Sequence, residues 1–174
     1  MESTIFPPVN FKSWIEENRH YLKPPVCNKL VFEENGFFIM VVGGPNSRKD
    51  YHYDEGPEFF YQVEGDMLLK TIQHQKIVEI PIKEGEIFLL PPKIPHSPQR
   101  FQDTVGLVIE RKRTDSEKDG LQWYCDYCSN LLYEEFFFLK DIEKDLPPVF
   151  DRFFSSQSHR TCKKCSHVME NPDK

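Results

Sequence analysis

The sequence predicts a mainly β fold, an antiparallel sandwich or barrel with a short N-terminal helix and a small C-terminal extension. Short apolar runs separated by turn residues recur from about residue 30 to residue 110. Phe occurs 15 times and Pro 14 times in 174 residues. Aromatic side chains favour strands, whereas Pro interrupts helices, so this composition favours a turn-rich β core over a helical bundle.

A short amphipathic helix is expected near the N-terminus. Asn10 is a suitable N-cap, and the residues after it place Phe11, Trp14 and Ile15 on one helical face. The Pro pair at 24–25 prevents the helix from continuing. We interpret this helix as a packing element.

The strands are expected in the central part of the chain. Its apolar runs lie at residues 30–44, 58–72, 76–82, 86–92 and 104–111. Their short length and the turn residues between them are typical of an antiparallel sandwich or barrel.

The character of the chain changes after these runs. Residues 111–120, RKRTDSEKDG, contain almost no apolar side chains and predict a solvated linker. We therefore expect a β domain with the N-terminal helix at 1–115 and a C-terminal extension at 116–174. The stretch 131–146 fits a helix or a strand, and the Pro pair at 147–148 is expected to end whichever element forms.

The charge balance argues against a dedicated nucleic-acid binder, because 22 basic and 28 acidic residues give a net charge of −6. No apolar stretch approaches 18 residues, and the N-terminal residues lack the pattern of a signal peptide. We expect a cytosolic protein without a membrane partner.

Two His and one Glu are candidates for a metal site. His52 and Glu58 lie six residues apart, an even spacing that places both on one face of an extended chain, and His96 follows a later turn-rich stretch. Two imidazoles and one carboxylate leave about half of an octahedral shell open, as in non-haem Fe(II) oxygenases. Substrate and O2 need such open positions.

The surroundings of these three residues resemble the two cupin signature motifs. The first, G-x5-H-x-H-x3-E-x6-G, is matched at His52 and Glu58, and the second, G-x5-P-x-G-x2-H-x3-N, at Gly85, Pro91 and His96. The resemblance implies a cupin fold, which is a jelly-roll barrel also described as a double-stranded β-helix.

The motifs also depart from the usual cupin pattern. Asp54 stands where many cupins have a second His, Lys93 replaces a Gly, and Arg100 replaces the final Asn. The first Gly is shifted to positions 43–44. We expect Asp54 not to bind metal, which leaves a site with three protein ligands.

Three further charged residues are candidates for the pocket. Arg48 lies four residues before His52 and Arg100 four residues after His96, so on strands each shares a face with its neighbouring ligand. Arg offers a planar fork for a carboxylate. Glu110 ends an apolar run, where it is either a solvated strand end or a base in the pocket.

Together these residues resemble one cupin family, the 3-hydroxyanthranilate 3,4-dioxygenases. The matching stretches are residues 41–70, 84–100 and 101–111. The resemblance implies ring opening of 3-hydroxyanthranilate by O2, at Fe(II), to a product that closes to quinolinate. Quinolinate is the pyridine precursor for NAD made from tryptophan along the kynurenine pathway. The resemblance also implies a homodimer.

The resemblance further implies roles for the pocket residues. Arg100 would bind the ring carboxylate, and Glu110 would accept the phenolic proton. Arg48 would stabilise negative charge on the bound oxygen, and Glu58 would lie beside the substrate.

A second metal site is predicted in the C-terminal extension. Cys125 and Cys128 form one C-x2-C pair, and Cys162 and Cys165 form another, so four thiolates can surround one ion. The set suits Fe or Zn, and we expect a structural role. A redox dithiol pair or disulfides are the alternatives, and Cys27 has no partner.

Two rival functions remain from the sequence alone. One is another cupin dioxygenase, acting on a thiol or an acireductone, against which Arg48, Arg100 and Glu110 argue together. The other is a catalytically silent cupin that serves as a binding protein, against which the complete set of three metal ligands argues.

Overall fold

The structure, a computed structural model, describes residues 5–33 and 36–171. Its helical segments, in chain order, are α1 (Phe11–Asn18), the 3-10 helix η1 (Arg19–Leu22), α2 (Ile142–Phe154) and α3 (Gln157–Arg160). The first six strands are β1 (Asn28–Phe32), β2 (Phe37–Gly43), β3 (Asp50–Tyr53), β4 (Glu58–Glu64), β5 (Met67–Gln73) and β6 (Lys76–Ile82). The remaining strands are β7 (Ile87–Leu90), β8 (His96–Arg100), β9 (Val105–Arg111), β10 (Asp119–Tyr124) and β11 (Leu131–Phe137).

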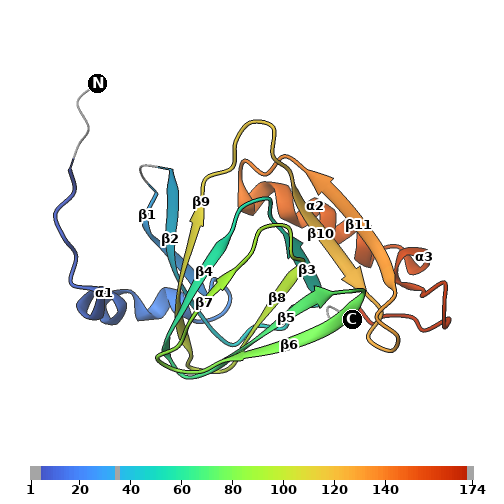
Figure 1. Cartoon of the computed structure of the whole chain (residues 1–174), viewed down its shortest axis with the longest axis horizontal. Helices are drawn as coiled ribbons and strands as arrows, with labels where there is room; N and C mark the ends of the chain where they lie inside the picture. The colour runs from blue at the N-terminus through green and yellow to red at the C-terminus, as the bar shows by residue number, and fades with distance from the viewer. Residues whose placement is uncertain (1–4, 34–35, 172–174) are drawn as a thin grey trace.

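The strands form two antiparallel sheets that face each other as a jelly-roll barrel (Figure 1). One sheet has the order β1-β2-β9-β4-β7, and the other has the order β11-β10-β3-β8-β5-β6. Strands close in sequence, such as β3 and β4, therefore belong to opposite sheets. The predicted mainly β fold, with a helix near the N-terminus and helices at the C-terminus, is confirmed.

The apolar core fills the space between the two sheets. Alternate residues of the strands point inward, which is the period of two expected for strands with one buried face. The buried members of this core are Phe60, Met67, Leu69, Ile82, Leu90 and Val108. Burial of such a core is the main favourable contribution to folding.

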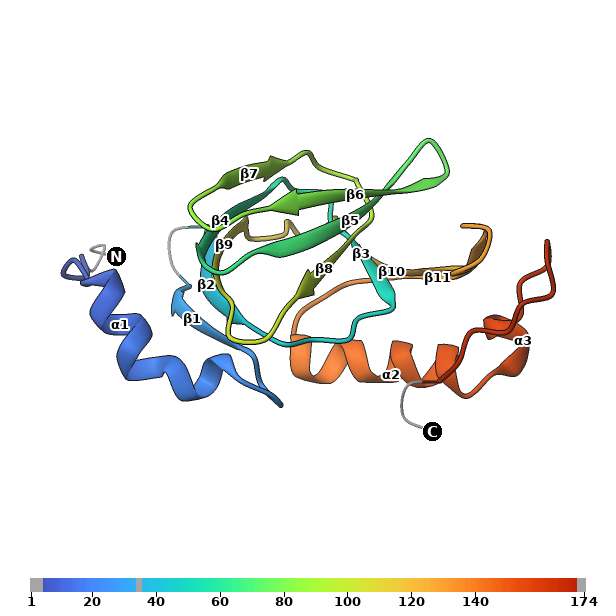
Figure 2. The ribbon, with the colours of Figure 1, turned by 90° about the horizontal axis from the view of Figure 1, so that it is seen from below.

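Helix α1 begins where the sequence predicts. The side chain of Asn10 accepts a hydrogen bond of 3.0 Å from the backbone N–H of Ser13, and Ile15 is buried. The helix packs against Val41 and Val105, at the opposite end of the barrel from α2 and α3 (Figure 2).

The stretch from 131 to 146 contains both of the expected alternatives. It forms strand β11 and then enters helix α2, and Pro147 and Pro148 lie inside that helix. The expectation that these two residues end the element is wrong. Val149 and Phe153 are fully buried against Trp123, and this packing stabilises the helix despite its two missing N–H donors.

Residues 111–120 also differ from the expected solvated linker. Arg113 is largely buried, and Asp119 begins strand β10, which pairs with β3 in the sheet of the barrel. Residues 114–116 and 118 are exposed, so only part of the stretch enters the fold, and its buried charges are paired with one another and with the barrel. None of the helices in the described part of the chain is long and apolar enough to cross a membrane.

Candidate active site

The three predicted metal ligands come together from opposite sheets. His52 of β3 lies directly opposite His96 of β8, and Glu58 begins β4 in the facing sheet. One ligand atom from each of the three residues lies within 4.8 Å of the others. Pairing of β3 with β8 therefore brings the two His residues together within one sheet, and the facing sheet adds Glu58.

The hydrogen bonds of His96 leave a place for a cation. Its Nδ1 lies 3.0 Å from the carbonyl oxygen of Ile94 and must donate to it, so the neutral ring has a lone pair on Nε2. That Nε2 lies 2.7 Å from Oε2 of Glu58, a buried carboxylate oxygen. Burial lowers the pKa of His96, but Glu58 outweighs burial and raises it, so a proton on Nε2 holds this contact when no metal is bound. An imidazole nitrogen and a carboxylate oxygen that share one cation in this way can also share a metal ion, so the group fits a metal site.

Electrostatics keep Glu58 anionic. Burial alone would raise the pKa of Glu58, but the neighbouring His96, His52 and Arg48 outweigh burial and hold the pKa below its ordinary value. A carboxylate that stays ionised when buried is suited to bind a cation.

His52 is held from behind by an acidic residue. Its Nε2 lies 2.7 Å from Oδ2 of Asp119, which is fully buried. With Nε2 engaged, Nδ1 is the ring nitrogen left to serve as a ligand. Arg113 also contacts Asp119, and the bonds from His52 and Arg113 outweigh burial and lower the pKa of Asp119.

A cavity of about 900 Å³ opens onto the three ligands. Arg48, Arg100 and Glu110 all line it, so the predicted charged residues share one pocket with the metal group. Apolar side chains of the barrel and of α2 complete the wall, among them Phe60, Val108, Leu146, Phe150 and Phe154. The mixture of apolar walls and a few charged groups suits a small aromatic acid.

Arg100 is a buried cation without an ionic partner. Its side chain is 3% exposed, no carboxylate of the described residues forms an ion pair with it, and its nearest polar contact is Oε1 of Gln62 at 3.4 Å. Burial lowers the pKa of Arg100 to about 10, which still leaves it charged at neutral pH. A guanidinium in this state favours an anionic ligand.

Glycine makes room for this guanidinium. A Cβ atom at Gly106 of β9 would lie 2.5 Å from Nη1 of Arg100 and 2.8 Å from Oε1 of Gln62. A larger residue here would collide with the guanidinium, so Gly106 allows Arg100 its close approach to this strand.

Arg48 and Glu110 each have a charged partner. Arg48 forms a short ion pair with Asp50, a buried residue two positions later. Oε2 of Glu110 accepts a hydrogen bond of 2.6 Å from Arg113. Burial and the nearby Glu58 raise the pKa of Glu110 even so, which makes it a stronger base than an exposed Glu.

Asp54 lies outside the ligand group. Its Oδ1 accepts a hydrogen bond of 2.7 Å from the backbone N–H of Gly56, and its Oδ2 lies 3.1 Å from Arg113. The second carboxylate of the cupin-like motif therefore contacts Arg113 and a turn instead of the metal group.

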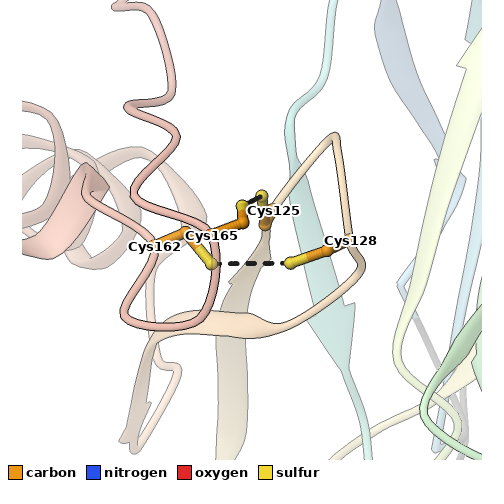
Figure 3. A group of neighbouring side chains, drawn as sticks. All are labelled: Cys125, Cys128, Cys162 and Cys165. Carbon is orange, nitrogen blue, oxygen red and sulfur yellow. Dashed lines mark hydrogen bonds between the residues drawn. The ribbon is translucent and has the colours of Figure 1, made fainter.

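The four predicted Cys of the extension form a second metal group (Figure 3). The Sγ atoms of Cys125 and Cys165 lie 3.6 Å apart, and those of Cys128 and Cys162 lie 3.5 Å apart. One pair follows β10, and the other lies in the C-terminal tail. Four sulfur atoms at these separations suit one tetrahedral ion.

The two Cys pairs use the same turn. Ser129 donates to the carbonyl of Cys125, and Ser166 donates in the same way to Cys162, with both Ser residues in the left-handed region at φ 56° and 63°. Burial opposes ionisation of Cys162, but the backbone N–H groups of Cys165 and Lys164 lower its pKa to about 7. The pKa of Cys165 moves the other way: the backbone N–H of His167 lowers it, but burial and the neighbouring sulfur atoms outweigh this and raise it to about 12. Four thiols this close cannot all ionise without a cation between them, which suits a metal ion.

Comparison with known proteins gives the family. A model of the 3-hydroxyanthranilic acid dioxygenase family matches residues 4–154. The chain belongs to this family. The 3-hydroxyanthranilate 3,4-dioxygenase of Xanthomonas euvesicatoria pv. vesicatoria is 58% identical over 170 residues, which are 98% of this chain and 96% of that protein. The protein of the same name from Xenopus tropicalis is 54% identical over 156 residues, 90% of this chain and 55% of that protein.

Among solved structures, a cupin-2 domain containing protein from Shewanella frigidimarina is similar with a TM-score of 0.49 and 16% identity. The match covers 60% of this chain and 94% of that one.

Membership of the 3-hydroxyanthranilic acid dioxygenase family confirms the resemblance found in the motifs and the assignment as a dioxygenase. It also decides against a thiol or acireductone dioxygenase and against a silent cupin. Sequence reasoning missed four residues that contact the candidate site: Asp50, Gly106, Arg113 and Asp119. The residues beside them in the sequence form no motif that would indicate a pocket.

Proposed function

We propose that this chain opens the aromatic ring of 3-hydroxyanthranilate with O2 at an Fe(II) held by His52, Glu58 and His96. The ring bond beside the hydroxyl breaks, and both oxygen atoms enter the product, 2-amino-3-carboxymuconate semialdehyde. When bound, the iron supplies the redox chemistry that lets O2 react with the neighbouring substrate. The product closes to quinolinate on the route from tryptophan to NAD.

One observation carries the choice of substrate class, namely the buried guanidinium of Arg100. It lies in the wall of the same cavity as the metal group and has no ion pair with any carboxylate of the described residues. A buried cation without an anion is unfavourable, so an aromatic acid that places its carboxylate there gains a charge-assisted hydrogen bond.

The remaining charged residues are matched to the groups of the substrate. Glu110 has a raised pKa and accepts the phenolic proton, which makes the substrate oxygen a better donor to the cation. Glu58 lies next to Glu110 across paired strands and so lies beside the bound ring. Arg48, fixed by Asp50, would stabilise negative charge that develops in the cavity during the reaction with O2.

The C-terminal group is proposed as a structural site with Fe or Zn. All four of its donors are Cys, so a tetrahedral ion there has no open position for a substrate. It joins the turn after β10 to the tail near Met169, within an extension that we place at 116–174, after a catalytic domain at 1–115.

A homodimer and a cytosolic location complete the proposal. The family supports the homodimer, and the arrangement of four Cys for metal binding supports a reducing compartment.

The test is oxygen consumption by protein loaded with Fe(II) under anaerobic conditions and then mixed with 3-hydroxyanthranilate and O2. We expect one O2 consumed per substrate and the absorbance of a ring-opened product. The metal content of the His52 group is measured on the same sample. Bound iron without oxygen uptake would contradict the proposed substrate while leaving the metal site in place.

A further inference from the structure

Arg113 is a largely buried cation that none of the proposed roles uses. Its side chain is 12% exposed, and its guanidinium contacts three carboxylates. The distances are 2.6 Å to Glu110, 2.8 Å to Asp119 and 3.1 Å to Asp54. A planar group with five N–H donors can satisfy several carboxylates at once, which a single ammonium cannot do in the same geometry.

Asp119 connects this guanidinium to the metal group. Oδ2 of Asp119 contacts both Nε2 of His52, at 2.7 Å, and Nη2 of Arg113, at 2.8 Å. Nε of Arg113 adds bonds of 3.1 Å and 3.2 Å to the two carboxylate oxygens. A fully buried carboxylate that is fixed in this way fixes the plane of the His ring.

Arg113 therefore lies between two groups with different roles. On one side, it reaches the ligand His52 through Asp119. On the other side, it binds Glu110, the proposed proton acceptor, directly. Both groups face the same cavity.

We propose that Arg113 and Asp119 are positioning residues that hold the metal ligand His52 and the proton acceptor Glu110 in a fixed relative arrangement. The inference rests on the proposed function for the role of Glu110, whereas the effect on His52 depends on metal binding alone. Asp119 sets the orientation of the His52 ring. Arg113 sets the positions of Asp119 and Glu110.

The test of Asp119 is metal affinity without substrate. The folded chain and the variants Asp119→Asn and Asp119→Ala are dialysed against graded free Co(II), and the bound metal per chain is measured. The intense thiolate-to-cobalt absorption reports the four-Cys group separately and serves as an internal control. We expect affinity at the His52 group to fall by about 10- to 100-fold, as is usual when such a carboxylate is lost, with the four-Cys group unchanged. Wild-type affinity in both variants would overturn the proposal.

The test of Arg113 compares Arg113→Lys and Arg113→Gln with Arg111→Lys. Arg111 is a matched control because it lies two residues away and pairs with Glu117 outside the cavity. We expect Arg113→Gln to weaken Co(II) binding by about tenfold or more, Arg113→Lys to restore part of the loss, and Arg111→Lys to leave affinity unchanged.

Steady-state kinetics and thermal unfolding separate positioning from structure. In the Fe(II)-loaded Arg113 variants, kcat falls while KM changes little, because Arg100 still binds the carboxylate. Arg113 variants with a lower melting temperature but wild-type metal affinity and kcat would show a structural role only and overturn the proposal. If the variants lose affinity for Co(II) but wild-type protein shows no oxygen uptake, the proposed function fails and the positioning of His52 stands.

Discussion

Arg100 is a cation in the cavity wall, and its free energy depends on what the cavity holds. A charge in this position is unfavourable when the pocket contains no anion and favourable when a carboxylate lies against it. The same reasoning applies to Glu110, whose raised pKa reflects burial and the nearby Glu58. Arg100 therefore has no anionic partner among the described residues, whereas Glu110 has a raised pKa even though it accepts a hydrogen bond from Arg113.

We predict that Arg100→Ala raises KM for 3-hydroxyanthranilate by about 30-fold or more, because truncating one partner of a buried charge pair costs about 2–5 kcal/mol. The measurement is steady-state oxygen uptake at full iron loading. 2-Aminophenol, which lacks the carboxylate, is the control substrate, and its KM should not rise in the variant. An equal rise for both compounds would mean that Arg100 does not bind the carboxylate.

We predict that kcat/KM falls on the acid side of a pH profile, with a midpoint above 4.5, the ordinary pKa of Glu. The sign follows because a proton on Glu110 prevents it from accepting the phenolic proton, and a raised pKa moves this loss to higher pH. Glu110→Gln should lower kcat by about 10²–10⁴-fold and remove this acid limb. An unchanged acid limb in Glu110→Gln would assign the titration to another group.

At the scale of elements, strand β9 serves the site through its inward face. Glu110 lies near one end of the strand, and Gly106 lies where the guanidinium of Arg100 crosses it. Val108, between them, belongs to the barrel core and also lines the cavity. At alternate positions, this short strand therefore carries the proposed base Glu110, the core residue Val108, and Gly106, which leaves space for the Arg100 side chain.

We predict that Gly106→Ala raises KM by displacing Arg100. The added Cβ would lie 2.5 Å from Nη1 of Arg100, and overpacking of this kind costs about 1–3 kcal/mol of folding stability. The rise in KM comes from the part of this cost that is relieved by moving Arg100, so it is at most roughly 150-fold. Kinetics with 3-hydroxyanthranilate and a thermal melt of the same sample give the two readouts. A lower melting temperature with unchanged KM would show that Arg100 adapts to the extra methyl group.

Some residues of the candidate site could be predicted from the sequence, and others could not. His52, Glu58 and His96 could be predicted because their spacing belongs to a recognisable motif. Arg113 and Asp119 could not, because a charged segment such as 111–120 resembles a solvated linker until its partners are known. Asp54 reaches Arg113 only in the folded barrel, so that pairing leaves no local pattern. Glu110 lies three residues before Arg113, but this spacing does not distinguish a buried pair from an exposed one.

Helix α2 is a second feature that the sequence alone did not predict. Two adjacent Pro residues argue for a break, yet the helix continues because Phe153 stacks on Trp123, with ring centroids 4.3 Å apart. Tertiary packing routinely outweighs intrinsic helix propensity, and the sequence does not show which residues will meet across the fold.

At the scale of the whole molecule, strand β10 connects the two metal groups. It begins with Asp119 behind His52 and leads at its other end into Cys125. It also pairs with β3 on one side and with β11 on the other, so the barrel and the extension share one sheet. Helix α2 is anchored to this sheet through the apolar cluster around Trp123, and this packing does not involve the four thiols.

We therefore predict that the two metal groups can be emptied independently. The double variant Cys162→Ser/Cys165→Ser should lose the four-Cys metal and unfold at a lower temperature, because metal binding to such sites contributes directly to folding. It should keep the iron at His52 and most of its kcat, since β10 remains paired with β3 and α2 remains packed on Trp123. The reverse variant, His52→Ala, should lose the iron and all activity but keep the four-Cys metal. Metal analysis of both variants together with oxygen uptake measures this, and loss of both metals in either variant would show that β10 transmits the disruption from one end to the other.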